Sequence, residues 1–195
     1  MSAKSEATTA NRSWLEDAEC LDVAIYAAIA RTDTPALDAA MRRLTEAANY
    51  SRLSLTAAAG LAVFGGPSGR RAAAKGLVSL GVTAAVVNLA IKPLGRRPRP
   101  ERAADVPLAR HVDMPKSRSF PSGHSAAAFA FATGVSHGSA AAAVPLHGLA
   151  AAVSYSRVHT GVHYPGDVLA GALLGIVLAQ VTTRSLARRW PKHFG

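Results

Sequence analysis

The 195-residue chain has few aromatic residues, a single cysteine and long stretches without any charged side chain. One cysteine, Cys20, excludes an intrachain disulfide and a zinc site made from several cysteines. Asp, Glu, Lys and Arg are all absent from four runs, at residues 53–69, 76–91, 119–156 and 168–183. A helix that crosses a bilayer needs about 20 mainly apolar residues, with a lower limit of about 17. Three of the runs are therefore close to one short span each, and the longest is sufficient for two.

This pattern predicts an all-α, polytopic membrane bundle of about five transmembrane helices with amphipathic helices before it. Residues 14–30 and 35–49 show helical periodicity, but their charges make them too polar to span. We expect both along the membrane interface or against the bundle. Residues 1–12 are polar and small, which predicts a disordered tail before a single domain at residues 13–195. The alternative is a compact soluble protein whose alanine-rich helices pack only on each other.

The net charge of +10 raises the question of nucleic-acid binding. The Lys and Arg clusters lie beside apolar runs with little aromatic interleaving, which fits anionic lipid headgroups and positive-inside topology better. We therefore expect a multi-pass protein of the bacterial plasma membrane that contacts membrane lipids and does not bind nucleic acid.

Two glycines in the last apolar run predict how the helices pack. Gly171 and Gly175 share one helix face and let a neighbouring backbone approach closely. Close packing within one chain is favoured over contact between two copies, although a homo-oligomer stays an open alternative.

A candidate phosphate site lies where the longest apolar run begins, at Pro121-Ser122-Gly123-His124. This segment predicts a helix start, whose free backbone N–H groups and positive dipole end attract phosphate. Gly123 leaves room for close approach of an anion, and Ser122 can donate its hydroxyl. A serine here can also serve only as a helix cap. His124 favours the phosphate site, because it adds a titratable group beside the anion.

The loop after residue 91 supplies positive charge between prolines. Lys92 provides a compact charge, and Arg99 can bind two phosphate oxygens at once with its planar guanidinium. The prolines stiffen the loop, which predicts that both cations are held in place. The other arginines of this loop are expected to bind lipid headgroups. They are Arg96, Arg97, Arg102 and Arg110.

The most specific pattern is His163 followed four residues later by Asp167, a spacing that brings both side chains together in a helix or turn. A carboxylate bonded to one imidazole nitrogen leaves the lone pair of the other nitrogen available for attack. Asp167 can also cap the last helix. Arg157 adds another phosphate-binding group, whereas His159 lacks such a carboxylate and is expected in a loop or a supporting role. No usual set of zinc ligands has the required spacing, so neither a metal nor a cofactor is expected.

Taken together, three motifs resemble those of the type 2 phosphatidic acid phosphatase (PAP2) family, over roughly residues 36–183. The motifs are Lys92-x6-Arg99-Pro100, Pro121-Ser122-Gly123-His124 and Ser156-Arg157-x5-His163-x3-Asp167. The resemblance implies a helical bundle with metal-independent phosphatase activity. It also implies that His163 is the nucleophile, oriented by Asp167, and that His124 is the general acid. The residues implied to hold the phosphoryl oxygens are Lys92, Arg99, Ser122, Gly123 and Arg157.

The substrate implied by the resemblance is a lipid phosphate: phosphatidic acid, phosphatidylglycerol phosphate, or a polyprenyl phosphate or diphosphate. A decaprenyl or other polyprenyl phosphoribose 5-phosphate phosphatase of cell-wall arabinan precursor synthesis is the alternative, by resemblance to small actinobacterial members. A vanadium haloperoxidase and a non-catalytic lipid-binding or transport protein are further alternatives. Many membrane members carry an additional span before the amphipathic segment, and none is recognised here. The side of the membrane that the site faces stays open.

Overall fold

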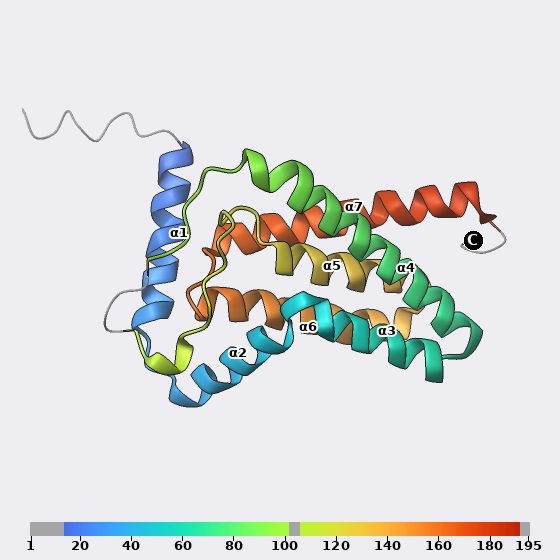
Figure 1. Cartoon of the computed structure of the whole chain (residues 1–195), viewed down its shortest axis with the longest axis horizontal. Coiled ribbons are helices and arrows are strands. Elements are labelled where there is room, and N and C mark those ends of the chain that lie inside the picture. Colours follow the sequence, from blue (N-terminus) through green and yellow to red (C-terminus); the bar gives the residue numbers. More distant parts are fainter. Residues whose placement is uncertain (1–13, 102–105, 192–195) are drawn as a thin grey trace, which may run out of the picture.

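The computed structural model describes residues 14–101 and 106–191 (Figure 1), and within them the chain forms helices and no strand. The main helices are α1 (Trp14–Arg31), α2 (Pro35–Ala47), α3 (Arg52–Phe64), α4 (Gly66–Ala85), α5 (Gly123–Ser136), α6 (Ala140–His159) and α7 (Pro165–Arg189). A π-helical segment, Val86–Ile91, and a 3-10 turn, Lys92–Leu94, continue α4. The all-α prediction is therefore confirmed. The predicted tail at residues 1–12 and Arg102 lie outside the described residues.

Helices α3 to α7 run along the long axis of the molecule, whereas α1 lies across one end of this bundle (Figure 1). These five helices coincide with the five expected spans. Two segments, Gly66–Leu94 and Pro165–Arg189, are long and apolar enough to cross a membrane by length and composition. The number of spans stays a prediction.

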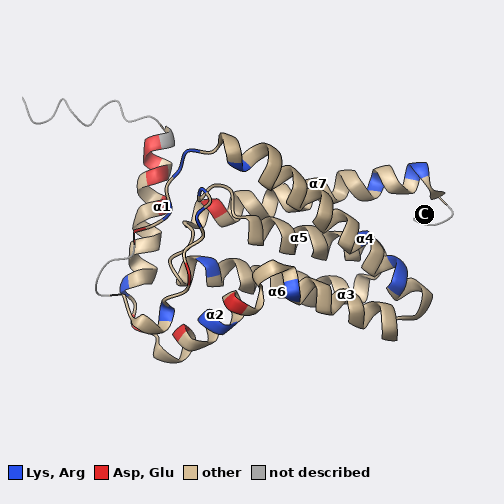
Figure 2. Ribbon diagram, in the orientation of Figure 1, with Lys and Arg blue, Asp and Glu red and all other residues tan. Residues whose placement is uncertain are grey.

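An exposed apolar row on α7 indicates the surface that meets lipid. Its side chains are Leu169, Leu173, Val177 and Val181, which are 64%, 64%, 57% and 57% exposed. Residues four apart lie on one helix face, so these four form a continuous stripe. Charged residues gather toward the two ends of the bundle, with mostly uncharged ribbon between them (Figure 2). A soluble protein rarely exposes an apolar surface of this kind, which favours a membrane over the soluble alternative.

Helices α5 and α7 pack with their backbones in close contact. The two glycines that were expected to allow such packing lie on α7. A Cβ added at Gly171 would collide with the carbonyl oxygen of Ser122, and one at Gly175 with that of Ala126. Any larger residue at either position would push the two helices apart. The predicted packing within one chain is confirmed, and it fixes the start of α5 beside the start of α7.

A buried ionic network attaches the α1–α2 hairpin to the rest of the molecule. The guanidinium of Arg110 donates from Nε to the Asp38 carboxylate over 2.7 Å, and His159 Nε2 lies 2.8 Å from the same oxygen. Arg110 also donates to backbone carbonyls at the end of α1 and to the hydroxyl of Thr34. Burial acts to raise the pKa of Asp38, but hydrogen bonds from His159, Thr34 and Arg110 hold it below its ordinary value.

One interpretation of the sequence is corrected by this network. Arg110 is fully buried, so the expectation that it binds lipid headgroups is wrong. Asp38, one of the charged residues of the segment 35–49, is 1% exposed, and α2 turns Asp38 and Thr45 toward the bundle. These two residues are seven apart and therefore share a helix face, which approaches the end of α6.

Candidate active site

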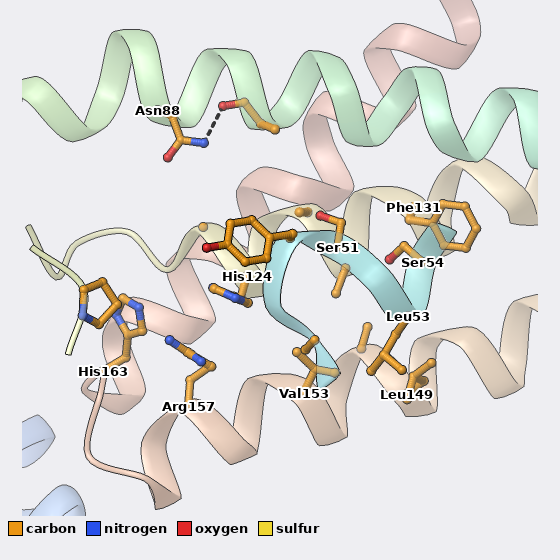
Figure 3. A pocket seen from close by; sticks show the side chains of 18 of the residues that line it. Ser51, Leu53, Ser54, Asn88, His124, Phe131, Leu149, Val153, Arg157 and His163 are labelled. Atoms are coloured by element: carbon orange, nitrogen blue, oxygen red, sulfur yellow. Dashed lines mark hydrogen bonds between the residues drawn. The ribbon is translucent and has the colours of Figure 1, made fainter. Parts of the chain in front are cut away.

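A pocket of about 240 Å³ opens at the end of the bundle where the loops meet (Figure 3). One wall is basic and the other is apolar, and the two meet at His124 on the first turn of α5. The basic wall consists of Lys92, Arg99, His124, Arg157 and His163, with Gly123 beside them. The sequence places these residues in three separate motifs, and the fold brings them around one cavity.

His163 lies in the turn between α6 and α7, next to the carboxylate of Asp167. The His163 Nδ1 to Asp167 Oδ2 distance is 3.4 Å, and both side chains are buried. The same carboxylate oxygen accepts the backbone N–H of Tyr164 at 3.0 Å and the hydroxyl of Ser119. Asp167 therefore stabilises the start of α7 and is held beside the imidazole at the same time.

The other imidazole nitrogen of His163 faces Arg99. Arg99 Nη1 lies 3.1 Å from His163 Nε2, and a guanidinium can only donate hydrogen bonds. Nε2 is therefore the unprotonated nitrogen, and Nδ1 carries the proton that points to Asp167. This tautomer leaves a lone pair on Nε2, on the pocket side of the ring.

Electrostatics favour the neutral ring. Burial lowers the pKa of His163 to about 4, with Asp167 acting in the opposite direction and the charges of Arg99 and Arg157 adding to the decrease. The imidazole is therefore unprotonated at Nε2 at neutral pH, which is the state a nucleophile requires.

The first turn of α5 presents its backbone to the pocket. Ser122 is the N-cap, and its hydroxyl accepts hydrogen bonds from the backbone N–H and hydroxyl of Ser125. Ser122 is fully buried and does not line the pocket, so the contact observed for its side chain is the capping one. A Cβ at Gly123 would lie 3.5 Å from Lys92 Nζ, so this turn faces the basic wall directly. A helix start offers backbone N–H groups that have no partner within the helix, and this one lies beside the cations.

Each cation of the basic wall is held by a contact to another element. Lys92 Nζ donates to the hydroxyl of Ser117 at 3.3 Å. Arg99 donates to the backbone carbonyls of Ser117 and Val162, both at 2.9 Å. Arg157, in the last turn of α6, donates to the hydroxyl of Thr45 on α2 at 2.7 Å. Three elements thus preorganise three positive charges around one space, and such an arrangement binds a dianion such as phosphate.

Four residues that the sequence analysis did not assign to the site support it. Ser119 donates to Asp167, and Asn49 Oδ1 lies 3.2 Å from His124 Nε2. Arg97, expected at lipid headgroups, instead lies between Asp167 and Asp22 of α1. Only Ser119 and Arg97 gave a local signal, since they are close in sequence to recognised motifs. Asn49 and Asp22 lie on the amino-terminal segment, where nothing in the pattern points to the site.

The apolar wall of the pocket extends from His124 along the bundle. It is made by α3, α5 and α6, and Figure 3 shows Leu53, Phe131, Leu149 and Val153 on this side of the cavity. Three small polar side chains, Ser51, Ser54 and Asn88, also line the pocket. The pocket therefore combines a basic end with a mainly apolar wall, which suits an amphipathic phosphate ester.

A family model matches more than half of the chain. The family model described as the PAP2 superfamily matches residues 72–191, a range that contains all three motifs. Two relatives from Mycobacterium tuberculosis, strains CDC 1551 and H37Rv, are named decaprenylphosphoryl-5-phosphoribose phosphatase and are 38% identical over 92 residues. The match covers 47% of this chain and 49% of each relative, so the chain spans about half the length of these relatives.

Two solved structures are similar over most of the chain. LpxE from Aquifex aeolicus aligns with a TM-score of 0.69 and 27% identity, covering 84% of this chain and 95% of that one. The first transmembrane PAP2-type phosphatidylglycerolphosphate phosphatase from Bacillus subtilis aligns with a TM-score of 0.66 and 24% identity, covering 89% and 88%. The second similarity shows a shared fold.

Proposed function

The chain belongs to the PAP2 superfamily, whose relatives compared above are phosphatases, and we propose that it hydrolyses a lipid phosphomonoester or diphosphate at the membrane surface. The observation that carries this proposal is the unprotonated Nε2 of His163 at a pocket with three fixed cations on one side and apolar walls on the other. We further propose that the protein is multi-pass in the plasma membrane, with α1 along the surface at the catalytic end.

In the proposed reaction, His163 Nε2 attacks phosphorus while the bond from phosphorus to the lipid oxygen breaks. His124 donates a proton to that departing oxygen, and a phosphohistidine forms. Water then attacks the phosphohistidine and gives a proton to His124, which releases inorganic phosphate and restores both rings. Phosphoryl transfer depends mostly on positioning and charge stabilisation, which the cation cluster supplies.

The phosphoryl oxygens would be held by Lys92, Arg99 and Arg157, with the N–H groups of Gly123 and His124 at the helix start. The hydroxyl of Ser122 stays a further predicted donor, although capping already engages it. The hydrogen bond from Arg99 to Nε2 would pass to a phosphate oxygen when substrate arrives, which frees the lone pair for attack. We propose no metal in this mechanism, because the cations already match the charge of the phosphate.

The size of the pocket indicates how much of the lipid it accepts. At about 240 Å³ it is smaller than the roughly 300–1,000 Å³ of sites that enclose a whole drug-sized ligand. It therefore takes the phosphate, the adjoining polar group and the beginning of an apolar chain, and the rest of the chain lies in the bilayer.

A polyprenyl phosphoribose 5-phosphate is the second candidate substrate. Two observations favour it: the name of the mycobacterial relatives, and the polar side chains in the lining of the pocket. Ser51, Ser54 and Asn88 offer hydrogen bonds that a ribose can use and that a polyprenyl phosphate without a sugar cannot.

Phosphate release from a panel of substrates tests the proposal. The panel contains phosphatidic acid, phosphatidylglycerol phosphate, polyprenyl phosphate, polyprenyl diphosphate and a polyprenyl phosphoribose 5-phosphate, each in mixed micelles with the intact protein. We expect release from at least one of them and undiminished release in excess EDTA. Release from none, or strict dependence on an added divalent metal, would contradict the proposed activity or its mechanism.

A bulky residue in the apolar wall should separate lipid from soluble substrates. Leu149→Trp fills the pocket beyond His124, so we expect activity on a long-chain phosphate to fall at least about tenfold, because an overfilled apolar site excludes its ligand. Activity on a short water-soluble phosphomonoester should stay within about threefold, since the basic wall is untouched.

Val144→Trp is the matched control on the same helix, because Val144 is 79% exposed and does not line the pocket. Equal losses on both substrates in Leu149→Trp, with Val144→Trp unaffected, would show that the apolar wall does not hold the lipid.

A further inference from the structure

The amino-terminal helix α1 contributes a carboxylate to the surroundings of the catalytic pair. Asp22, near the middle of α1, is only 9% exposed, although most of its neighbours on that helix face outward. Its Oδ2 lies 2.7 Å from Arg97 Nη1, and its Oδ1 accepts the backbone N–H of Gly166 at 2.6 Å. Gly166 belongs to the first turn of α7, one residue before Asp167. A single side chain of α1 therefore holds both a loop arginine and the turn that carries the catalytic carboxylate.

Arg97 connects this carboxylate to Asp167. The same Nη1 that meets Asp22 lies 3.1 Å from Asp167 Oδ1. The guanidinium also stacks on the ring of Tyr164, with Cζ 4.2 Å from the ring centroid. Tyr164 is held in turn by an edge-to-face contact with Tyr26 of α1, at 5.6 Å between centroids. Arg97 is thus fixed from two directions, by charge and by an aromatic face.

The two oxygens of Asp167 have separate partners. Oδ2 takes the hydroxyl of Ser119, the N–H of Tyr164 and the imidazole, whereas Oδ1 takes Arg97. Arg97 therefore sets the rotation of the carboxylate about its own axis, which decides how Oδ2 meets His163 Nδ1. The positive charge of Arg97 also partly neutralises the Asp167 carboxylate, which would otherwise favour the protonated form of the imidazole more strongly.

We propose that Arg97 and Asp22 are positioning residues for the His163–Asp167 pair, and that α1 serves the active site through them. This inference rests on the proposed role of His163 as nucleophile. The groups that face His163 from the packed elements are Asp167 on α7, Arg157 on α6, His124 on α5, and Arg99 and Ser119 in the loops. Of these only Asp167 is anionic, and Arg97 is the cation bonded to it.

The charge of Arg97 determines the direction in which its removal shifts the pKa of His163. Burial acts to lower the pKa of Arg97, but hydrogen bonds and charge from Asp22 and Asp167 hold it above its ordinary value, so Arg97 is always cationic. Removing this charge leaves Asp167 to act more strongly on His163, which raises the pKa of the ring. Because the active ring is the neutral one, the loss of activity on acidification should begin at a higher pH.

The test compares variants of the full chain in detergent micelles. For each variant we measure kcat, KM and the pKa of the His163 ring by NMR titration. The ring signal of His163 is assigned as the one that is missing from the spectrum of a His163→Gln variant. Arg97→Gln should lower kcat about 10²-fold, the cost of a small misplacement of reacting groups, with KM unchanged and the ring pKa raised. Arg97→Lys keeps the charge without the planar fork, so it should lower kcat while leaving the ring pKa near that of the wild type. Asp22→Asn keeps an acceptor for Gly166 and should lower kcat about tenfold.

Arg96→Gln is the matched control, because Arg96 is the exposed neighbour in the same loop, and its kcat should equal that of the wild type. A kcat for Arg97→Gln within threefold of this control overturns the inference. A large loss of kcat with an unmoved ring pKa also overturns it, because that result would show a purely structural role.

If Arg97→Gln does not accumulate as folded protein, Asp22→Asn carries the same test. If the wild type releases no phosphate from any substrate, the proposed function fails, and the ring titration still tests the link from Arg97 to His163.

Discussion

Replacing His163 by alanine is expected to abolish phosphate release while the protein still folds. The side chain supplies the attacking atom, and loss of a nucleophile costs on the order of 10⁶ in kcat in other hydrolases, so we expect a decrease of at least about 10³-fold. Folding should survive, because the Ser119 hydroxyl and the Tyr164 N–H still satisfy the carboxylate behind the ring. The measurement is inorganic phosphate released from the best substrate of the panel.

His137→Ala is the control for this experiment, because His137 is an exposed histidine at the α5–α6 turn and does not line the pocket. In the wild type, a rapid quench should also trap protein-bound phosphate that survives alkali and is lost in acid, as expected of phosphohistidine. Substantial turnover by His163→Ala, or the same trapped label in that variant, would assign the nucleophile elsewhere.

Replacing Arg110 by alanine should cause the largest loss of stability. Its guanidinium is fully buried and serves Asp38, the carbonyls at the end of α1 and the Thr34 hydroxyl together. Removing one partner of a buried ion pair costs about 3–5 kcal/mol, because the other charge stays buried and uncompensated. We expect a decrease of this size in the free energy of unfolding, measured by denaturant titration in micelles.

Arg43→Ala provides the comparison, since Arg43 is exposed on α2 close to the same network. A surface substitution of this kind usually changes stability by less than about 0.5 kcal/mol. An Arg110→Ala protein as stable as Arg43→Ala would mean that the buried network contributes nothing to holding the hairpin in place.

Local patterns made the helices of the bundle and the contact between His163 and Asp167 predictable from the sequence. Charge-free runs give the positions of α5, α6 and α7, and a spacing of four residues is sufficient to place His163 beside Asp167. The start of α5 is equally local, because a serine, a glycine and the following apolar run define it. In each case the interacting groups are neighbours along the chain, so periodicity and spacing are sufficient to predict their contact.

The arginines show where such reasoning ends. Arg96, Arg97 and Arg110 lie in one polar loop and look alike in sequence, yet one is exposed, one bridges two carboxylates and one is buried. The difference arises from partners far along the chain: Asp167 lies 70 residues from Arg97, and Asp38 lies 72 from Arg110. Composition shows that the loop is basic, but only the tertiary contacts determine which of its arginines pairs with a carboxylate.

The hydrogen bond from Gly166 to Asp22 joins residues 144 positions apart and has a consequence for how the protein is made. A chain is synthesised from its amino terminus and its early parts fold first. Asp22 and α1 therefore emerge long before the turn that they hold, and until α7 has been made Asp22 can pair with Arg97 but not with Gly166. The proposed His163–Asp167 pair is likewise incomplete until then, because Asp167 lies in the first turn of α7. The contact between α1 and α7 and the completed pair are therefore expected to form together, when α7 joins the bundle.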